Sequence, residues 1–254
     1  MREQVELKSA DEIARIRDAS LIVHDVLRQV IDAIVPGMTT LDVDRLAEAA
    51  TAARGAQPAF KGYHGYPNVI CVSVNEEVVH GIPSSRALVE GDIVGLDFGI
   101  LYRGYHGDSA YTVPVGVPAP GVSRLLETTR EALARAIAEA RPGARLGDIG
   151  FAVQSFVESR GYSVVREFVG HGIGRRLHEP PQVPNYGAPG TGIRLRPGMV
   201  LAIEPMVNAG APGIRTLDDV WTAVTLDGSL SAHFEHTIAI TEAGPEILSL
   251  PRGS

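Results

Sequence analysis

The sequence has a single cysteine, Cys71, among 254 residues. An intrachain disulfide and a zinc site built from several cysteines are therefore excluded, and we expect a reducing, cytoplasmic location. No apolar run approaches the ~18 residues of a membrane-spanning helix, and the charged N-terminal stretch lacks the apolar core of a signal peptide. Basic residues are also scarce: 23 lysines and arginines stand against 30 acidic residues, which argues against direct, specific nucleic-acid binding.

Apolar residues, by contrast, are abundant enough for a large core, since they make up 44% of the chain. Apolar residues at helical spacing, bounded by caps and breakers, predict helices at about Ser9–Ile34, Leu41–Arg54, Ser123–Glu139 and Asp148–Arg160. Short β-branched runs predict strands at Val69–Val74, Ile93–Phe98, Ser109–Val115, Val164–Val169, Val200–Ile203, Val220–Thr225 and His236–Ile240. The helices come in two clusters, so we predict an α+β fold in one domain over 1–254.

An internal repeat gives the most information about function. Four pairs of segments match in the same order: "PGMTTLD" with "PGARLGD", "NEEVVHGIP" with "REFVGHGIG", "LVEGDIVGLD" with "LRPGMVLAIE", and "HGD" with "HFE". These matches predict two related halves, roughly 1–120 and 121–250, that face each other across a pseudo-twofold axis. They align His80 with His171, Asp97 with Glu204, and Asp108 with Glu235.

Each half thus supplies one histidine and two carboxylates, which would converge where the halves meet. Carboxylates gathered in a dry cleft raise each other's pKa steeply unless cations neutralise them. Two divalent ions about 3.5–4 Å apart would do so. Mixed carboxylate and imidazole ligands favour Mn, Fe, Co or Zn over Ca or Mg.

Each candidate taken singly also has a structural alternative. An isolated Asp often caps a turn, a lone His or Trp often packs in the core, and an arginine pair is often solvated; these alternatives apply to Asp97, Asp108, His80, His171, Trp221 and Gly174–Arg176. Glu204 and Glu235 are harder to explain structurally, because each adjoins an apolar run and needs a partner. No phosphate loop, H-E-x-x-H helix or G-x-S-x-G elbow offers a rival chemistry.

The chain resembles the type I methionine aminopeptidases, a family of pita-bread metallopeptidases. The resemblance covers nearly the whole chain, in "GYHGYPNVICVSVNEEVVHGIP", "GDIVGLDFGILYRGYHGDSAYTVPVG", "FVGHGIGRRLHEPPQVPNYG", "LRPGMVLAIEPM" and "AHFEHTIAIT". It implies a curved antiparallel sheet backed by two helix pairs with internal pseudo-twofold symmetry. Because the resemblance is to the short bacterial form, we expect no N-terminal extension with zinc-binding cysteines.

The resemblance also implies roles for single residues. Asp108 and Glu235 would bridge two metal ions, Asp97 would bind one of them with both oxygens, and His171 and Glu204 would hold the other. Glu204 would take a proton from the water that becomes the attacking hydroxide and pass it to the leaving amine. His80 and His178 would position the substrate and stabilise the transition state. A monovalent cation near Asn75 and Ser231 is a further expectation.

The expected substrate is the initiator methionine of nascent polypeptides and peptides with a small second residue. Its side-chain pocket would be lined by Phe60, Tyr63, Tyr66, Cys71, Leu177 and Trp221. The chain departs from the family at Phe60, Val79 and Leu177, where a small or sulfur-bearing residue, Cys and Phe are usual, so the pocket's detailed shape differs. We expect a monomer with at most transient contact with the ribosome. The alternatives are an Xaa-Pro aminopeptidase or dipeptidase, or a non-catalytic binding protein.

Overall fold

The computed structural model describes residues 5–253. Four α-helices and one short 3₁₀ helix lie among fifteen strands in this part of the chain. The helices are α1 (Ala10–Ala33), α2 (Thr40–Ala53), η1 (Tyr63–Gly65), α3 (Pro120–Glu139) and α4 (Leu146–Ser159). The strands are β1 (Gln57–Pro58), β2 (Cys71–Val74), β3 (Glu77–Val79), β4 (Ile93–Tyr102), β5 (Tyr105–Pro114), β6 (Ser163–Val164), β7 (Gly170–Gly172), β8 (Glu179–Val183), β9 (Val200–Ile203), β10 (Met206–Asn208), β11 (Ile214–Thr216), β12 (Ala223–Thr225), β13 (Ser231–His233), β14 (Glu235–Thr241) and β15 (Gly244–Ile247).

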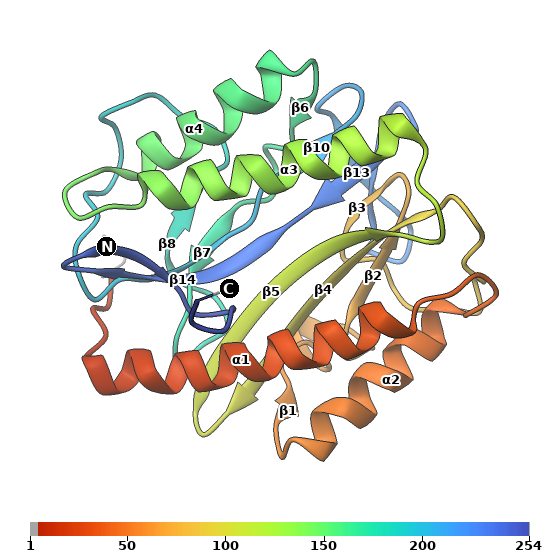
Figure 1. The fold of residues 1–254 in the computed structure, drawn as a ribbon, viewed down its shortest axis with the longest axis horizontal. Helices are drawn as coiled ribbons and strands as arrows, with labels where there is room; N and C mark the ends of the chain where they lie inside the picture. The colour runs from red at the N-terminus through yellow and green to blue at the C-terminus, as the bar shows by residue number, and fades with distance from the viewer. Residues whose placement is uncertain (1–4, 254) are drawn as a thin grey trace.

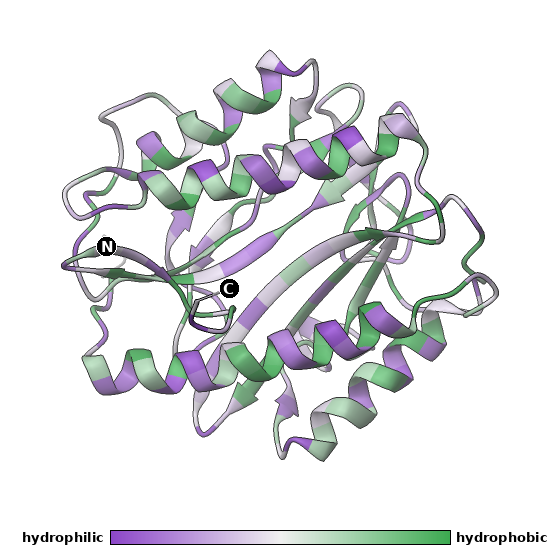
Figure 2. Ribbon diagram, viewed as in Figure 1, coloured by the Kyte–Doolittle hydropathy of each residue, from purple (hydrophilic) through white to green (hydrophobic). Residues whose placement is uncertain are grey.

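The helix starts are set by local capping. Ser9 and Glu12 form a reciprocal capping box at α1, and Thr39 and Asp42 form one at α2. All four predicted helices are confirmed within a few residues. Hydrophobic and hydrophilic residues alternate along each of them, as expected of helices with one buried face (Figure 2). None of the helices described here has the length and apolarity needed to cross a bilayer.

A mainly antiparallel, nine-stranded sheet forms the centre of the fold. Its strands follow the order β1-β4-β5-β14-β9-β7-β8, with β2 added to β4 and β15 added to β14. Two three-stranded sheets, β13-β10-β6 and β11-β12-β3, adjoin it. The helix pair α1–α2 lies beside one half of the large sheet and the pair α3–α4 beside the other (Figure 1).

The core is divided in the same way as the helices. One apolar cluster packs α1 and α2 against β2 and β4, and a second packs α3 and α4 against β9 and β14. A third, smaller cluster includes Phe60, Tyr66, Cys71 and Leu177 and belongs to the functional site described below. This architecture confirms the predicted pita-bread fold, whereas the exact division into halves near residue 120 stays a prediction.

One predicted strand is wrong. The run Val164–Val169 is not a single strand, because β6 ends at Val164 and β7 begins only at Gly170. β6 pairs with β10 in a small sheet, whereas β7 pairs with β9 in the large one. The segment therefore crosses between two sheets: Val164 and Val165 are buried beside the small sheet, whereas Arg166 and Glu167 at the crossing are exposed.

Candidate metal centre and substrate pocket

The predicted metal ligands lie on five neighbouring strands of the large sheet. β4 carries Asp97, β5 carries Asp108, β14 begins at Glu235, β9 is followed at once by Glu204, and β7 carries His171. The register places Asp97 opposite Ala110 and Ala110 opposite Glu235. Alternate residues of a strand share a face, so these side chains gather on one face of the sheet.

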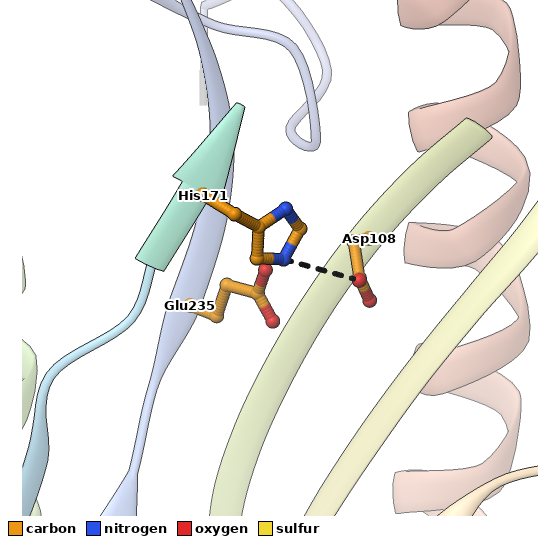
Figure 3. Close-up of side chains that lie close together, drawn as sticks. All are labelled: Asp108, His171 and Glu235. Atoms are coloured by element: carbon orange, nitrogen blue, oxygen red, sulfur yellow. Dashed lines mark ion pairs between the residues drawn. The ribbon is translucent and has the colours of Figure 1, made fainter. Parts of the chain in front are cut away.

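Asp108, His171 and Glu235 form the centre of this group. Their ligand atoms all lie within 4.8 Å of one another, and all three residues are buried. Figure 3 shows the side chains pointing toward one another from three strands. His171 Nε2 lies 3.9 Å from Asp108 Oδ2 and 3.5 Å from Glu204 Oε1. Gly99 keeps this space open, because a Cβ there would lie 3.2 Å from Asp108 Oδ1 and 2.8 Å from Phe60.

Burial strongly perturbs the protonation of these groups. It raises the pKa of Asp97 to about 7, with a further contribution from Glu204, and the pKa of Glu204 to about 8. Burial and then neighbouring carboxylates raise the pKa of Asp108 and of Glu235 well above the usual range. Such a group of carboxylates ionises fully only when cations offset its mutual repulsion.

The histidine of the centre is prepared as a neutral ligand. Burial lowers the pKa of His171 to about 3, so the ring is uncharged near neutral pH. Its Nδ1 lies 2.9 Å from the backbone carbonyl of Gly172, to which a protonated Nδ1 donates. The lone pair then belongs to Nε2, the nitrogen that faces Asp108 and Glu204.

The donor set fits divalent cations. Buried oxygens of Asp97, Asp108 and Glu235 have no hydrogen-bond partner within the described chain. Unpartnered buried oxygens on ionisable groups cost stability unless a ligand completes them. Carboxylate and imidazole ligands together suit first-row transition metals. The arrangement can therefore hold metal, and these three carboxylate oxygens all belong to residues predicted as metal ligands.

A cavity of about 260 Å³ adjoins the metal centre. This volume is below the roughly 300–1,000 Å³ of sites for drug-sized ligands, so it suits a single side chain. All six residues predicted for the side-chain pocket line it, together with the five predicted metal ligands, His64, His80 and His178. Four of its walls are almost fully buried: Phe60, Tyr66, Cys71 and Leu177.

His80 and His178 are two of the histidines that line this cavity. The Tyr63 hydroxyl lies 2.7 Å from His178 Nδ1, and the His178 ring packs edge-on against His171 at 4.3 Å. Desolvation in the cleft lowers the pKa of His178 and of His80 to about 4 each, so both are neutral near pH 7. His80 adopts a positive φ of 61°, uncommon outside glycine, and its ring packs edge-on against Phe168.

Two histidines near the centre were not predicted. His64 lines the cavity. His233 is buried, and its Nε2 lies 3.6 Å from Glu204 Oε2. His233 had a usable signal, since it stands two residues before Glu235 and alternate residues of extended chain share a face. His64 had none, because its place depends on how the Gly62–Tyr66 turn folds over the sheet.

Comparison with known proteins identifies the family. The sequence model of metallopeptidase family M24 matches residues 14–242. The chain belongs to metallopeptidase family M24. Its relatives in this family include methionine aminopeptidase 1 of Bacillus subtilis, which is 53% identical over 242 residues, or 95% of this chain and 98% of the relative. The resemblance to methionine aminopeptidases is thereby confirmed.

Solved structures of similar proteins agree with the fold described above. The crystal structure of methionine aminopeptidase from Thermotoga maritima superposes with a TM-score of 0.96 at 50% identity, over 98% of this chain and 100% of that one. The prolidase from Pyrococcus furiosus reaches a TM-score of 0.77 at 26% identity, over 97% of this chain and 66% of that one. This prolidase is therefore a more distant structural neighbour than the methionine aminopeptidase.

Proposed function

We propose that this M24 protein is a methionine aminopeptidase that removes the N-terminal methionine from peptides and nascent polypeptides with a small second residue. The observation that carries the proposal is a largely apolar cavity beside the buried carboxylate and histidine cluster. The relatives named methionine aminopeptidase support it at about half identity over nearly the full chain. Aromatic and sulfur-bearing walls at Tyr66, Cys71 and Trp221 suit a thioether side chain.

Five residues would hold two divalent ions: Asp97, Asp108, His171, Glu204 and Glu235. When bound, such ions supply Lewis-acid activation of water and of the substrate carbonyl near neutral pH. Mn, Fe, Co and Zn are the candidate ions, because the ligands mix carboxylate oxygens with imidazole. A monovalent cation near Asn75 and Ser231 is part of the same proposal; the Ser231 amide donates to the Asn75 carbonyl there, which joins the two segments.

The chain's own residues would divide the remaining work. Glu204 would accept the proton of the attacking water and pass it to the leaving amine, a role that suits a buried carboxyl with a perturbed pKa. His178 would donate from Nε2 to the developing oxyanion, provided that the Tyr63 hydroxyl donates to Nδ1 and so fixes this tautomer. The His80 ring forms no hydrogen bond within residues 5–253, so its nitrogens are available to the substrate backbone.

The proposal extends to the protein's surroundings. The partner is the N-terminus of a nascent chain, which places the enzyme in the cytoplasm, with at most transient contact with the ribosome. The single cysteine, which is buried, agrees with a reducing compartment. We expect the protein to act as a monomer, since one chain supplies every residue assigned to the site.

A metal-reconstituted peptidase assay tests the proposal. Purified protein is stripped with a chelator, reloaded separately with each candidate ion, and given Met-Ala-Ser or an Xaa-Pro dipeptide. We expect release of free methionine from Met-Ala-Ser, little cleavage of the Xaa-Pro dipeptide, and loss of activity in Asp108→Asn and Glu204→Ala. Preferential cleavage of the Xaa-Pro dipeptide would instead favour a prolidase, and inactivity with every ion would favour a binding protein.

A further inference from the structure

A second cavity, of about 570 Å³, also adjoins the metal centre. It shares five residues with the methionine cavity: His80, Asp97, His171, His178 and Glu204. In the proposed function, the scissile bond lies over these shared residues and the methionine side chain fills the smaller cavity. The rest of the peptide then extends through the second cavity, which Phe168, Arg176 and Gln182 also line.

Two adjacent arginines near this cavity have different environments. Arg175 is held outside it, because its guanidinium lies 3.3 Å from Glu12 Oε1 and 4.8 Å from the Tyr105 ring centre. Arg176 lines the cavity and is exposed to solvent. Within residues 5–253 its guanidinium forms neither an ion pair nor a hydrogen bond. Its positive charge nevertheless acts on the cleft: burial raises the pKa of Tyr63, and the Arg176 charge partly offsets that rise.

The other charged residues that line this cavity are either paired within the protein or assigned to the metal centre. Glu179 is buried, and its Oε2 lies 2.7 Å from Lys8 Nζ, which neutralises it. Its Oε1 accepts the backbone N–H of Arg176 and so fixes where the Arg176 side chain starts. Asp97 and Glu204 belong to the proposed metal centre. Among the described residues that line the cavity, Arg176 is the only basic one of the lysine or arginine type.

We propose that Arg176 is a specificity-determining residue for the downstream part of the substrate. It favours peptides with an acidic side chain at the third or fourth residue and disfavours basic side chains there. The inference rests on the proposed aminopeptidase function, because it needs the peptide to extend from the metal centre into the second cavity. An exposed charge pair of this kind is expected to change kcat/KM by about two- to fivefold, and more at low salt than at high salt.

Competition between paired peptides tests this inference. Met-Ala-Glu-Gly and Met-Ala-Lys-Gly are mixed and cleaved by one enzyme sample, then Met-Ala-Gly-Glu and Met-Ala-Gly-Lys likewise. The ratio of their rates does not depend on how much of the sample is folded. Wild type should prefer the Glu peptide in at least one pair, Arg176→Gln should bring the ratio close to one, and Arg176→Glu should invert it. Raising the salt concentration should weaken the wild-type preference.

Arg28→Gln serves as the control for net charge. Arg28 lies on α1, is more than half exposed and pairs with Asp32 within its own helix, so its loss removes the same charge away from the cleft. This variant should keep the wild-type ratio. Equal cleavage of Glu and Lys peptides by wild type, or a ratio that Arg176→Glu leaves unchanged, overturns the inference alone. No methionine release from any peptide instead overturns the proposed function.

Discussion

The buried ion pair between Lys8 and Glu179 connects the start of the described chain to the loop that carries His178. Lys8 Nζ lies 2.7 Å from Glu179 Oε2, and the two side chains are 1% and 3% exposed. The Lys8 amide also donates to Gly198, and a Cβ at Gly174 would lie 2.6 Å from the Lys8 side chain. Replacing Lys8 with Met keeps most of the volume but removes the charge.

The expected cost of Lys8→Met follows from what it leaves behind. The Glu179 carboxylate would stay buried with the Arg176 backbone N–H as its remaining partner. Breaking a buried pair in this way typically costs about 3–5 kcal/mol of unfolding free energy. We also expect a lower kcat, because the Gly174–Glu179 loop places both Leu177 and His178 in the cavity. Urea unfolding of chelator-treated protein measures the stability without the contribution of bound metal.

The double variant Lys8→Met/Glu179→Gln separates the charge effect from lost packing. The amide oxygen of the introduced glutamine would still accept from the Arg176 backbone N–H, and no uncompensated buried charge would remain, because Glu6, the other partner of Lys8, is half exposed. The double variant should therefore be more stable than Lys8→Met alone, with a favourable coupling in the double-mutant cycle. A loss below about 1 kcal/mol in Lys8→Met, or a double variant as unstable as the sum of the single variants, would refute this account of the pair.

Three further predictions concern the site and its surroundings. Tyr63→Phe removes the hydroxyl beside His178 and should lower kcat about two- to tenfold with a smaller change in KM; unchanged steady-state kinetics would contradict it. Adding Mn²⁺ to metal-free protein at pH 7 should release protons, because burial raises the pKa of Asp97 to about 7 and of Glu204 to about 8; a pH indicator that records no release counts against the assigned ligands. The Ser9 amide, followed by other contacts, lowers the pKa of Glu12 from 4.5 to about 2, so its stabilisation is complete above pH 4.5 and disappears as the pH falls toward 2. Acid unfolding curves should thus fall less steeply over this range for Glu12→Gln than for wild type, and parallel curves would argue against the shift.

Much of the fold could be read from neighbouring residues along the chain. The capping boxes at Ser9 and Thr39 start their helices because a cap and its partner stand three residues apart. The hairpin of β4 and β5 was expected from apolar strands joined by a short Gly-containing turn, and it pairs continuously from Ile93 to Pro114. The internal repeat also brought together the residue types that a metal centre needs. These sequence features are local or repeated, so they can be recognised without knowing how the chain packs.

Tertiary structure decided which of these residues meet. Lys8 and Glu179 stand 171 residues apart, and no local pattern marks them as a pair. Arg175 and Arg176 are adjacent and chemically alike, yet one contacts Glu12 while the other lines the second cavity. His233 reaches Glu204 only because β13 and β10 pair across the small sheet. Such contacts depend on the order and register of strands that are distant in sequence. The order and register are decided by the packing of the two apolar clusters against the sheet.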